Sequence, residues 1–379
     1  MRWVSGLLRR RPARILGGVL AIGLTVAFLA SLGAFFSSSK ARMTQEAAAG
    51  VPVDWQLQLQ AGTSVRRARR MVRATSGVRR IEPVEFANTP GLRSSSGGAV
   101  QTTGSGKVLG LPHGYARAFP GELRFLVGAR SGVLIAQQAA ANLHATIGSV
   151  VEVEREGLPP VRVRVQGIVD LPQADSLFQV VGLPPGSGLT APPDNVVLLP
   201  ASTWNRYFGG RAAVRPGATY EQLHVALDPA TLPPDPSAAF AQVLTSAHNL
   251  EARLAGGGTV GDNLGAQLDA SRSDSLYAQL LFLFLGVPGA ILAALLAGVI
   301  GSAARDRRRQ EQALLRIRGA TPKRIARLAA AEALFVGVAG SAIGLGGATL
   351  AGRLAFGTWR FGPNTAQAAA WAGGAAGKQ

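Results

Sequence analysis

Three stretches of the chain lack charged residues and are long enough to cross a bilayer. They cover residues 15–39, 275–304 and 333–352. A membrane helix needs about 20 mainly apolar residues, because each residue rises about 1.5 Å and the hydrocarbon core is about 30 Å thick. We therefore predict transmembrane helices at residues 15–39, 276–303 and 329–355, and an integral membrane protein.

The first apolar stretch also has a basic front, as a cleaved signal peptide would. Its apolar core is longer than the 7–15 residues typical of a signal peptide, and no convincing cleavage site follows it. We interpret it as a retained membrane helix.

The segment between the first two apolar stretches has the pattern of a folded α+β domain. Alternating apolar and polar positions predict strands, whereas a basic amphipathic run and an Ala-rich run predict helices. The flanks, residues 40–49 and 262–275, are expected to continue the membrane helices outward as a stalk. Residues 88–107, which are rich in Ser, Gly and Thr, are expected to form a mobile loop. The predicted strands are 51–60, 78–86, 150–156, 161–169, 195–199 and 220–227, and the predicted helices are 63–74 and 236–254.

Charge assigns the two sides of the membrane. The chain carries a formal net charge of +18, and two short flanks hold most of it. Residues 1–14 contain five Arg and no acid, and residues 304–328 contain nine basic and two acidic residues. Excess positive charge in short loops marks the cytoplasmic side. We therefore expect 1–14 and 304–328 to be cytoplasmic and 40–275 and the tail 356–379 to be extracytoplasmic, in the plasma membrane. Basic segments that set topology argue against a nucleic-acid partner.

Few residues offer catalytic or metal chemistry. The chain has no cysteine, which excludes thiolate sites, and its four histidines are scattered. Gly104 to Lys107 lacks the flanking residues of a phosphate-binding loop, since Gln101 and Val108 occupy those positions. The carboxylates of Glu152, Glu154 and Glu156 are interpreted as a solvated strand face. We predict no enzyme activity, no cofactor and no metal site.

The cytoplasmic segment between the second and third helices is the most specific part of the sequence. The second helix has no breaker between Gly301 and Arg318 and ends at a glycine that suits a left-handed C-terminal position. A threonine and a proline then suit the start of the next helix. The result is a short, rigid helical turn, which is either a docking element for a cytoplasmic partner or a tight turn whose arginines fix topology. The candidate residues are Glu311, Leu314, Leu315, Arg316, Arg318, Gly319, Ala320, Thr321 and Pro322.

The third apolar stretch carries small residues on one helical face. Gly340 and Gly344 form a GxxxG motif, and Gly337 lies near the same face. Small residues let helix backbones approach closely in lipid, although membrane helices are often rich in Gly and Ala. These three glycines are candidate packing positions. Pro288 in the second helix predicts a kink.

The run Arg308, Glu311, Ala313 to Arg316 and Gly319 to Thr321 resembles the FtsX-like and MacB-like permeases of ABC transporters. The order of helix, large outer domain and closely spaced helices is similar to that family, and residues 147–170 resemble its periplasmic core domain. The resemblance implies a separate cytoplasmic ATP-binding cassette subunit that docks on residues 311–322. It also implies mechanotransmission, in which ATP-driven motion of the helices reaches the outer domain.

The resemblance leaves the substrate open, since relatives handle lipoproteins, peptides, lipids or drugs. Some relatives activate cell-wall enzymes and transport nothing, so a membrane-anchored regulator or sensor is the alternative. The family has a fourth helix, which 356–379 is too short and too weakly apolar to form. We therefore expect a second permease chain or half to supply further helices.

Overall fold

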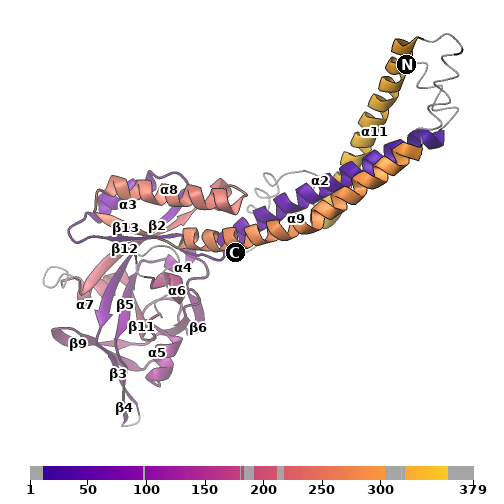
Figure 1. Ribbon diagram of the computed structural model, residues 1–379. Helices are drawn as coiled ribbons and strands as arrows, with labels where there is room; N and C mark the ends of the chain where they lie inside the picture. The colour runs from indigo at the N-terminus through magenta and orange to yellow at the C-terminus, as the bar shows by residue number, and fades with distance from the viewer. Residues whose placement is uncertain are drawn as a thin grey trace. The chain divides into compact units, whose positions relative to one another are not determined.

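The computed structural model describes residues 12–96, 99–179, 181–182, 192–210, 217–303, 317 and 321–356. The chain divides into two compact units, one comprising Met1–Met43 and Ser273–Gln379 and the other Thr44–Arg272 (Figure 1). All but Phe356 of the predicted tail 356–379 lies outside the described residues.

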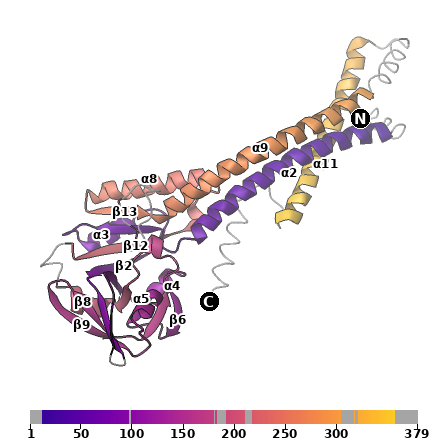
Figure 2. The same ribbon diagram turned by 60° about the horizontal axis from the view of Figure 1, so that its bottom comes forward.

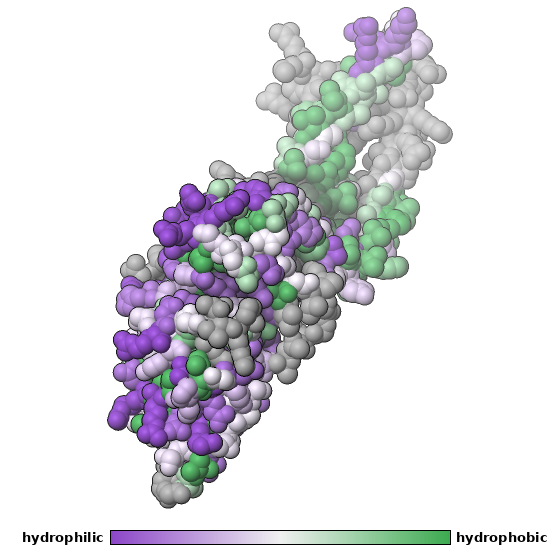
Figure 3. Space-filling model, turned by 90° about the vertical axis from the view of Figure 1, so that its left-hand side faces the viewer, coloured by the Kyte–Doolittle hydropathy of each residue, from purple (hydrophilic) through white to green (hydrophobic). Residues whose placement is uncertain are grey.

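Three long helices are apolar enough to cross a membrane: α2 (Pro12–Ala49), α9 (Asn263–Ala303) and α11 (Pro322–Phe356). The three predicted membrane helices are thereby confirmed as candidate spans. Many of their large apolar side chains are exposed, such as Leu24 at 72% and Phe284 at 77%, which suits a surface that faces lipid. Figure 3 shows these hydrophobic residues gathered on the helices, whereas the visible surface of the outer domain is mainly hydrophilic.

The second unit, called the outer domain below, is built on a nine-stranded mixed sheet. Its strand order is β13-β1-β12-β2-β5-β11-β7-β10-β6. Most neighbours are antiparallel, but β11 runs parallel to β5 and β10 runs parallel to β7. The strands are β1 (Trp55–Leu59), β2 (Val78–Thr89), β5 (Gly106–Leu111), β6 (Arg124–Gly128), β7 (Leu134–Ala136), β10 (Gly167–Asp170), β11 (Val196–Pro200), β12 (Thr219–Leu227) and β13 (Gly258–Asp262).

A second sheet of four strands, in the order β4-β3-β8-β9, completes the outer domain. It contains β3 (Leu92–Ser96), β4 (Ala99–Thr102), β8 (Val150–Arg155) and β9 (Leu158–Arg164). The predicted hairpin of 150–156 with 161–169 corresponds to β8 and β9, although the turn is shorter and β10 is a separate strand of the large sheet.

Helices cover the large sheet. The amphipathic α3 (Val65–Arg73) and α8 (Pro236–Leu254) pack together and contact β2 and β13, respectively (Figures 1 and 2). The Asp235 carboxylate accepts hydrogen bonds from the backbone N–H groups of Ser237 and Ala238, which caps α8 at its predicted start. The short helices are α4 (Tyr115–Ala118), α5 (Gln137–Asn142), α6 (Ala174–Leu177), α7 (Ala201–Phe208) and the 3-10 turn η1 (Pro229–Thr231). This mixture of sheets and helices confirms the predicted α+β class.

The prediction of a mobile loop at residues 88–107 was wrong. This segment contains β3 and β4, which pair antiparallel, and β3 also pairs with β8. Leu92 is buried, and its backbone N–H donates to the side chain of Thr103 at 3.1 Å. The hydroxyl of Thr89 is buried and donates to backbone carbonyls at Gly91 and Glu154. Ser and Thr therefore form strand pairs here because tertiary partners satisfy their hydroxyl groups, which composition alone does not reveal.

Candidate coupling elements and outer-domain pocket

Most of the predicted coupling turn lies outside the described residues, namely Glu311, Leu314, Leu315, Arg316, Arg318, Gly319 and Ala320. The structure describes its last part. The Thr321 carbonyl accepts from the backbone N–H groups of Arg324 at 3.0 Å and Ile325 at 3.2 Å, so Pro322 occupies the first position of α11. This arrangement suits proline, because the first helical N–H has no partner within a helix.

The membrane unit packs α11 against α2 through glycine. A Cβ atom at Gly340 would lie 2.8 Å from Cβ of Ile22, and one at Gly344 would lie 2.6 Å from the carbonyl oxygen of Gly23. Only glycine permits such an approach without displacement of a backbone. Gly337 lies outside this contact, since a Cβ there would meet no described atom within 4 Å.

The contact between α9 and α2 uses two further glycines that the sequence analysis did not single out. A Cβ at Gly286 would lie 2.9 Å from Leu32, and one at Gly289 would lie 2.9 Å from the ring of Phe28. The rings of Phe35 and Phe282 pack nearby, with centroids 5.0 Å apart. In the sequence, Gly286 and Gly289 lie three residues apart beside Pro288, a spacing that differs from the GxxxG pattern and so did not indicate a packing face.

The last turn of α2 packs inside the outer domain and is hydrogen-bonded to it. Thr44 is 2% exposed, and its hydroxyl donates a hydrogen bond to the Pro234 carbonyl at 3.0 Å, just before α8. Ala47 and Ala48 are also buried. α2 is continuous from Pro12 to Ala49, so a single helix connects the first apolar stretch to buried residues of the outer domain.

The first turns of α9 pack against the same domain and are hydrogen-bonded to it. The Asn263 side chain donates to the Val53 carbonyl at 3.0 Å, and Leu264 and Leu268 are buried. The Asp262 carboxylate caps the helix by accepting from the Gly265 N–H at 2.7 Å, and it also accepts from Nε1 of Trp55 at 3.1 Å. Strand β1 and the start of α9 therefore share one hydrogen-bonded junction.

Two carboxyl groups are buried at this junction. Burial raises the pKa of Asp54 to about 7, although its hydrogen bond from the Leu227 N–H at 2.6 Å opposes the rise. Burial likewise raises the pKa of Asp262 to about 6, against the hydrogen bonds that it accepts. The charge of Asp262 also repels that of Asp54, which contributes to the raised pKa of Asp54.

A second buried polar group lies beneath α4. The Tyr115 hydroxyl is 2.8 Å from Nδ1 of His224, whose Nε2 lies 3.1 Å from the Gln222 side chain. Burial lowers the pKa of His224 to about 3, so its ring is neutral. Glu122 is fully buried and neither of its carboxylate oxygens has a partner among the described residues, so burial raises its pKa to about 8.

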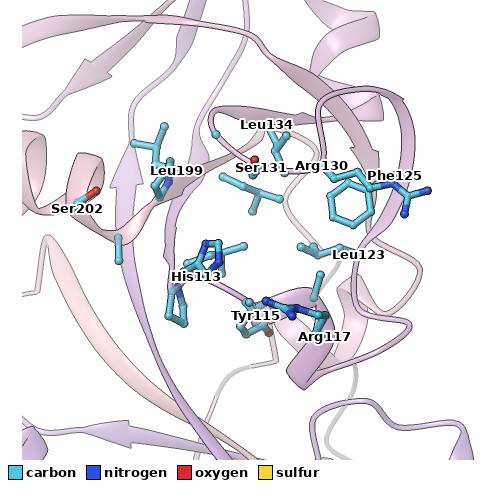
Figure 4. Close-up of a pocket in the computed structure, with 18 residues that line it drawn as sticks. His113, Tyr115, Arg117, Leu123, Phe125, Arg130, Ser131, Leu134, Leu199 and Ser202 are labelled. Carbon is cyan, nitrogen blue, oxygen red and sulfur yellow. The ribbon is translucent and has the colours of Figure 1, made fainter. Parts of the chain in front are cut away.

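The outer domain also contains a pocket of about 780 Å³ next to α4 (Figure 4). Its lining comes from the end of β5, α4, the β6–β7 turn and the start of α7. Tyr115 lines the pocket and contacts His224 with its hydroxyl, so the buried polar group borders the pocket.

Two of the three carboxylates interpreted as a solvated strand face, Glu152 and Glu154, form ion pairs with arginines. Glu152 contacts Arg162 at 2.7 Å, and Glu154 contacts Arg93 at 3.5 Å. Within the described ranges, no group of three or more His, Asp or Glu side chains is arranged to hold a metal ion.

The fold and these elements define a membrane subunit with an inserted extramembrane α+β domain. Two family models match it: the MacB-like periplasmic core domain over residues 16–242 and the FtsX-like permease C-terminal over residues 280–374. The chain belongs to the FtsX-like and MacB-like permease family and is an ABC transporter permease-type subunit. No curated protein matches the chain.

Proposed function

We propose that this chain couples ATP hydrolysis on a separate cytoplasmic ATPase subunit to motion of its outer domain. In this proposal residues 1–14 and 304–328 face the cytoplasm, and residues 311–322 form the docking turn. A second permease chain or half completes the helix bundle. The motion would export or extract a lipoprotein, peptide, lipid or drug.

The attachment of both α2 and α9 to the outer domain is the observation that carries the proposal. Each is a single continuous helix, and each ends or begins among buried residues of that domain. Helices are stiff along their axes, because backbone hydrogen bonds tie successive turns together; Pro288 in α9 is an exception, since it has no N–H to donate. A displacement of α2 relative to α9 in the membrane would therefore reach β1 and the segment before α8.

Permeases of this family generally work with a cytoplasmic ATPase. A detergent pull-down of the chain from its host, followed by mass spectrometry, tests whether this one does. We expect an ATP-binding cassette subunit in stoichiometric amount and a further membrane chain or a second copy. Recovery of extracytoplasmic cell-wall enzymes without any ATPase would contradict the proposal and favour the regulator.

The docking turn can be tested with one charged and one apolar substitution at the same position. Leu315→Asp should abolish ATPase association, because a carboxylate would replace the apolar contact, whereas Leu315→Met keeps similar volume and should retain it. Membrane insertion of both variants is checked by fractionation. Normal ATPase binding by the inserted Leu315→Asp variant would show that docking lies elsewhere.

A further inference from the structure

The outer-domain pocket opens where two parallel strands end. β5 and β11 run in the same direction with Leu111 and Pro200 in register, so both chains leave the sheet at one edge. On its other side β11 pairs antiparallel with β7, so strand direction changes here. Ligands of open sheets with parallel strands commonly bind at such carboxyl ends. The volume of about 780 Å³ falls within the range of about 300–1,000 Å³ of small-molecule sites.

The floor and walls of the pocket are apolar. Leu134 is 4% exposed, and Leu198 and Leu199 are each 1% exposed, so the floor is part of the domain core. Leu123 and Phe125 are half-buried and form a wall. Leu123 and Phe125 therefore offer a hydrocarbon surface to anything that enters, and the buried leucines support it from behind.

The rim of the pocket is basic. Arg117 extends from α4 and Arg130 from the turn after β6, and both are exposed (Figure 4). The Arg130 guanidinium lies 5.9 Å from the centre of the Phe125 ring, which keeps the charge beside the apolar wall. Neither arginine forms an ion pair within the described part of the chain, and none of the described lining residues is acidic.

We propose that this pocket binds a single-chain amphipathic anion. The hydrocarbon chain would lie on Leu123 and Phe125, and a carboxylate or phosphate head would be held by Arg117 and Arg130. Guanidinium groups bind both kinds of head through paired N–H donors. An apolar wall with two unpaired cations at the rim suits this class better than a neutral hydrocarbon or a free inorganic anion.

A fluorescent reporter at the rim measures binding directly. The chain has no cysteine, so Ser202→Cys provides one attachment point for an environment-sensitive dye on an exposed lining residue. The purified full chain, held in lipid nanodiscs without an ATPase, is titrated with octanoate, octanol and inorganic phosphate. We expect saturable binding of octanoate, at least about tenfold weaker binding of octanol, and no response to phosphate at the same concentrations.

Substitutions then locate the head group. In the reporter chain, Arg117→Gln and Arg130→Gln should each weaken octanoate binding by about tenfold or more, because each removes a charged donor. Arg66→Gln, on the exposed face of α3, is the matched control and should leave the affinity unchanged. Octanol binding as tight as octanoate, a response to phosphate alone, no octanoate binding, or unchanged affinity in both rim variants would each overturn the proposal. Because no ATPase is present, these outcomes are independent of the coupling proposal.

Discussion

The glycine contact between α2 and α11 gives a prediction that can be tested by adding a single methyl group, through a glycine-to-alanine substitution. At Gly344 the added Cβ of alanine would lie 2.6 Å from the Gly23 carbonyl oxygen and 2.7 Å from Cβ of Val26. Optimal separations are about 3.5–4.0 Å, so the two helices must separate by about 1 Å. Such overpacking typically costs about 1–3 kcal/mol. Gly337 on the same helix has open space at its Cβ position, so Gly337→Ala is the matched control.

The assay follows separation of the two helices. Gly33 on α2 and Gly346 on α11 both have open space at the Cβ position, so cysteines there can carry a donor and an acceptor dye in a chain that has no other cysteine. Unfolding is driven by rising SDS in mixed micelles. We expect the free energy of unfolding of Gly344→Ala to be about 1–3 kcal/mol lower than that of Gly337→Ala, because both gain the helix propensity of alanine and only Gly344→Ala is overpacked. Equal unfolding curves for the two variants would refute the packing of α11 on α2 through Gly344.

Three further predictions concern the outer domain and its attachment. Burial raises the pKa of Glu122 to about 8, so folding binds a proton and stability should fall as pH rises from about 5 to 8. In thermal unfolding of the purified chain, Glu122→Gln should make this fall smaller. An unchanged pH dependence would contradict the assignment. Thr44→Val leaves the Pro234 carbonyl without its partner and should cost about 1–2 kcal/mol in denaturant unfolding, whereas Thr25→Val should cost less, because the Thr25 hydroxyl bonds only within its own helix. A cysteine at exposed Arg70 should react with an impermeant maleimide on intact cells, and a cysteine at exposed Lys323 should react only after permeabilisation; the reverse pattern would invert the topology.

Local patterns were enough to predict the elements whose signal is strong. Three apolar stretches marked the membrane helices, because length and lack of charge are decisive in a bilayer. The predicted helix 236–254 agrees with α8, and the structure shows why it begins there: Asp235 caps the helix and proline suits its first position. The strand around Trp55 followed from alternation, and both Trp55 and Leu57 are indeed fully buried.

The pairing of strands could not be predicted in the same way. The short strands β6, β7 and β13 were not predicted, and the predicted strand 161–169 covers parts of two strands, β9 and β10, that belong to different sheets. Runs of three to five residues give alternation few positions in which to show itself. Their place in the sheet depends on partners far away in the sequence, as when Trp55 pairs with Val225 on one side and with Asp262 on the other. The pocket escaped prediction for the same reason, because its lining is assembled from segments that end on neighbouring strands.

Glycine shows most clearly where sequence reasoning reaches its limit. Gly337, Gly340 and Gly344 have the same chemistry and lie on one helix, yet a Cβ would meet α2 at the last two and open space at the first. What separates them is the path of α2, whose own Gly23 lets the backbones approach: a Cβ there would lie 3.3 Å from the Gly340 carbonyl. A small-residue motif therefore predicts that a helix can be approached closely, and only the partner helix decides which of its glycines is used. Gly337 remains open for contact with the further membrane helices that the proposed complex requires.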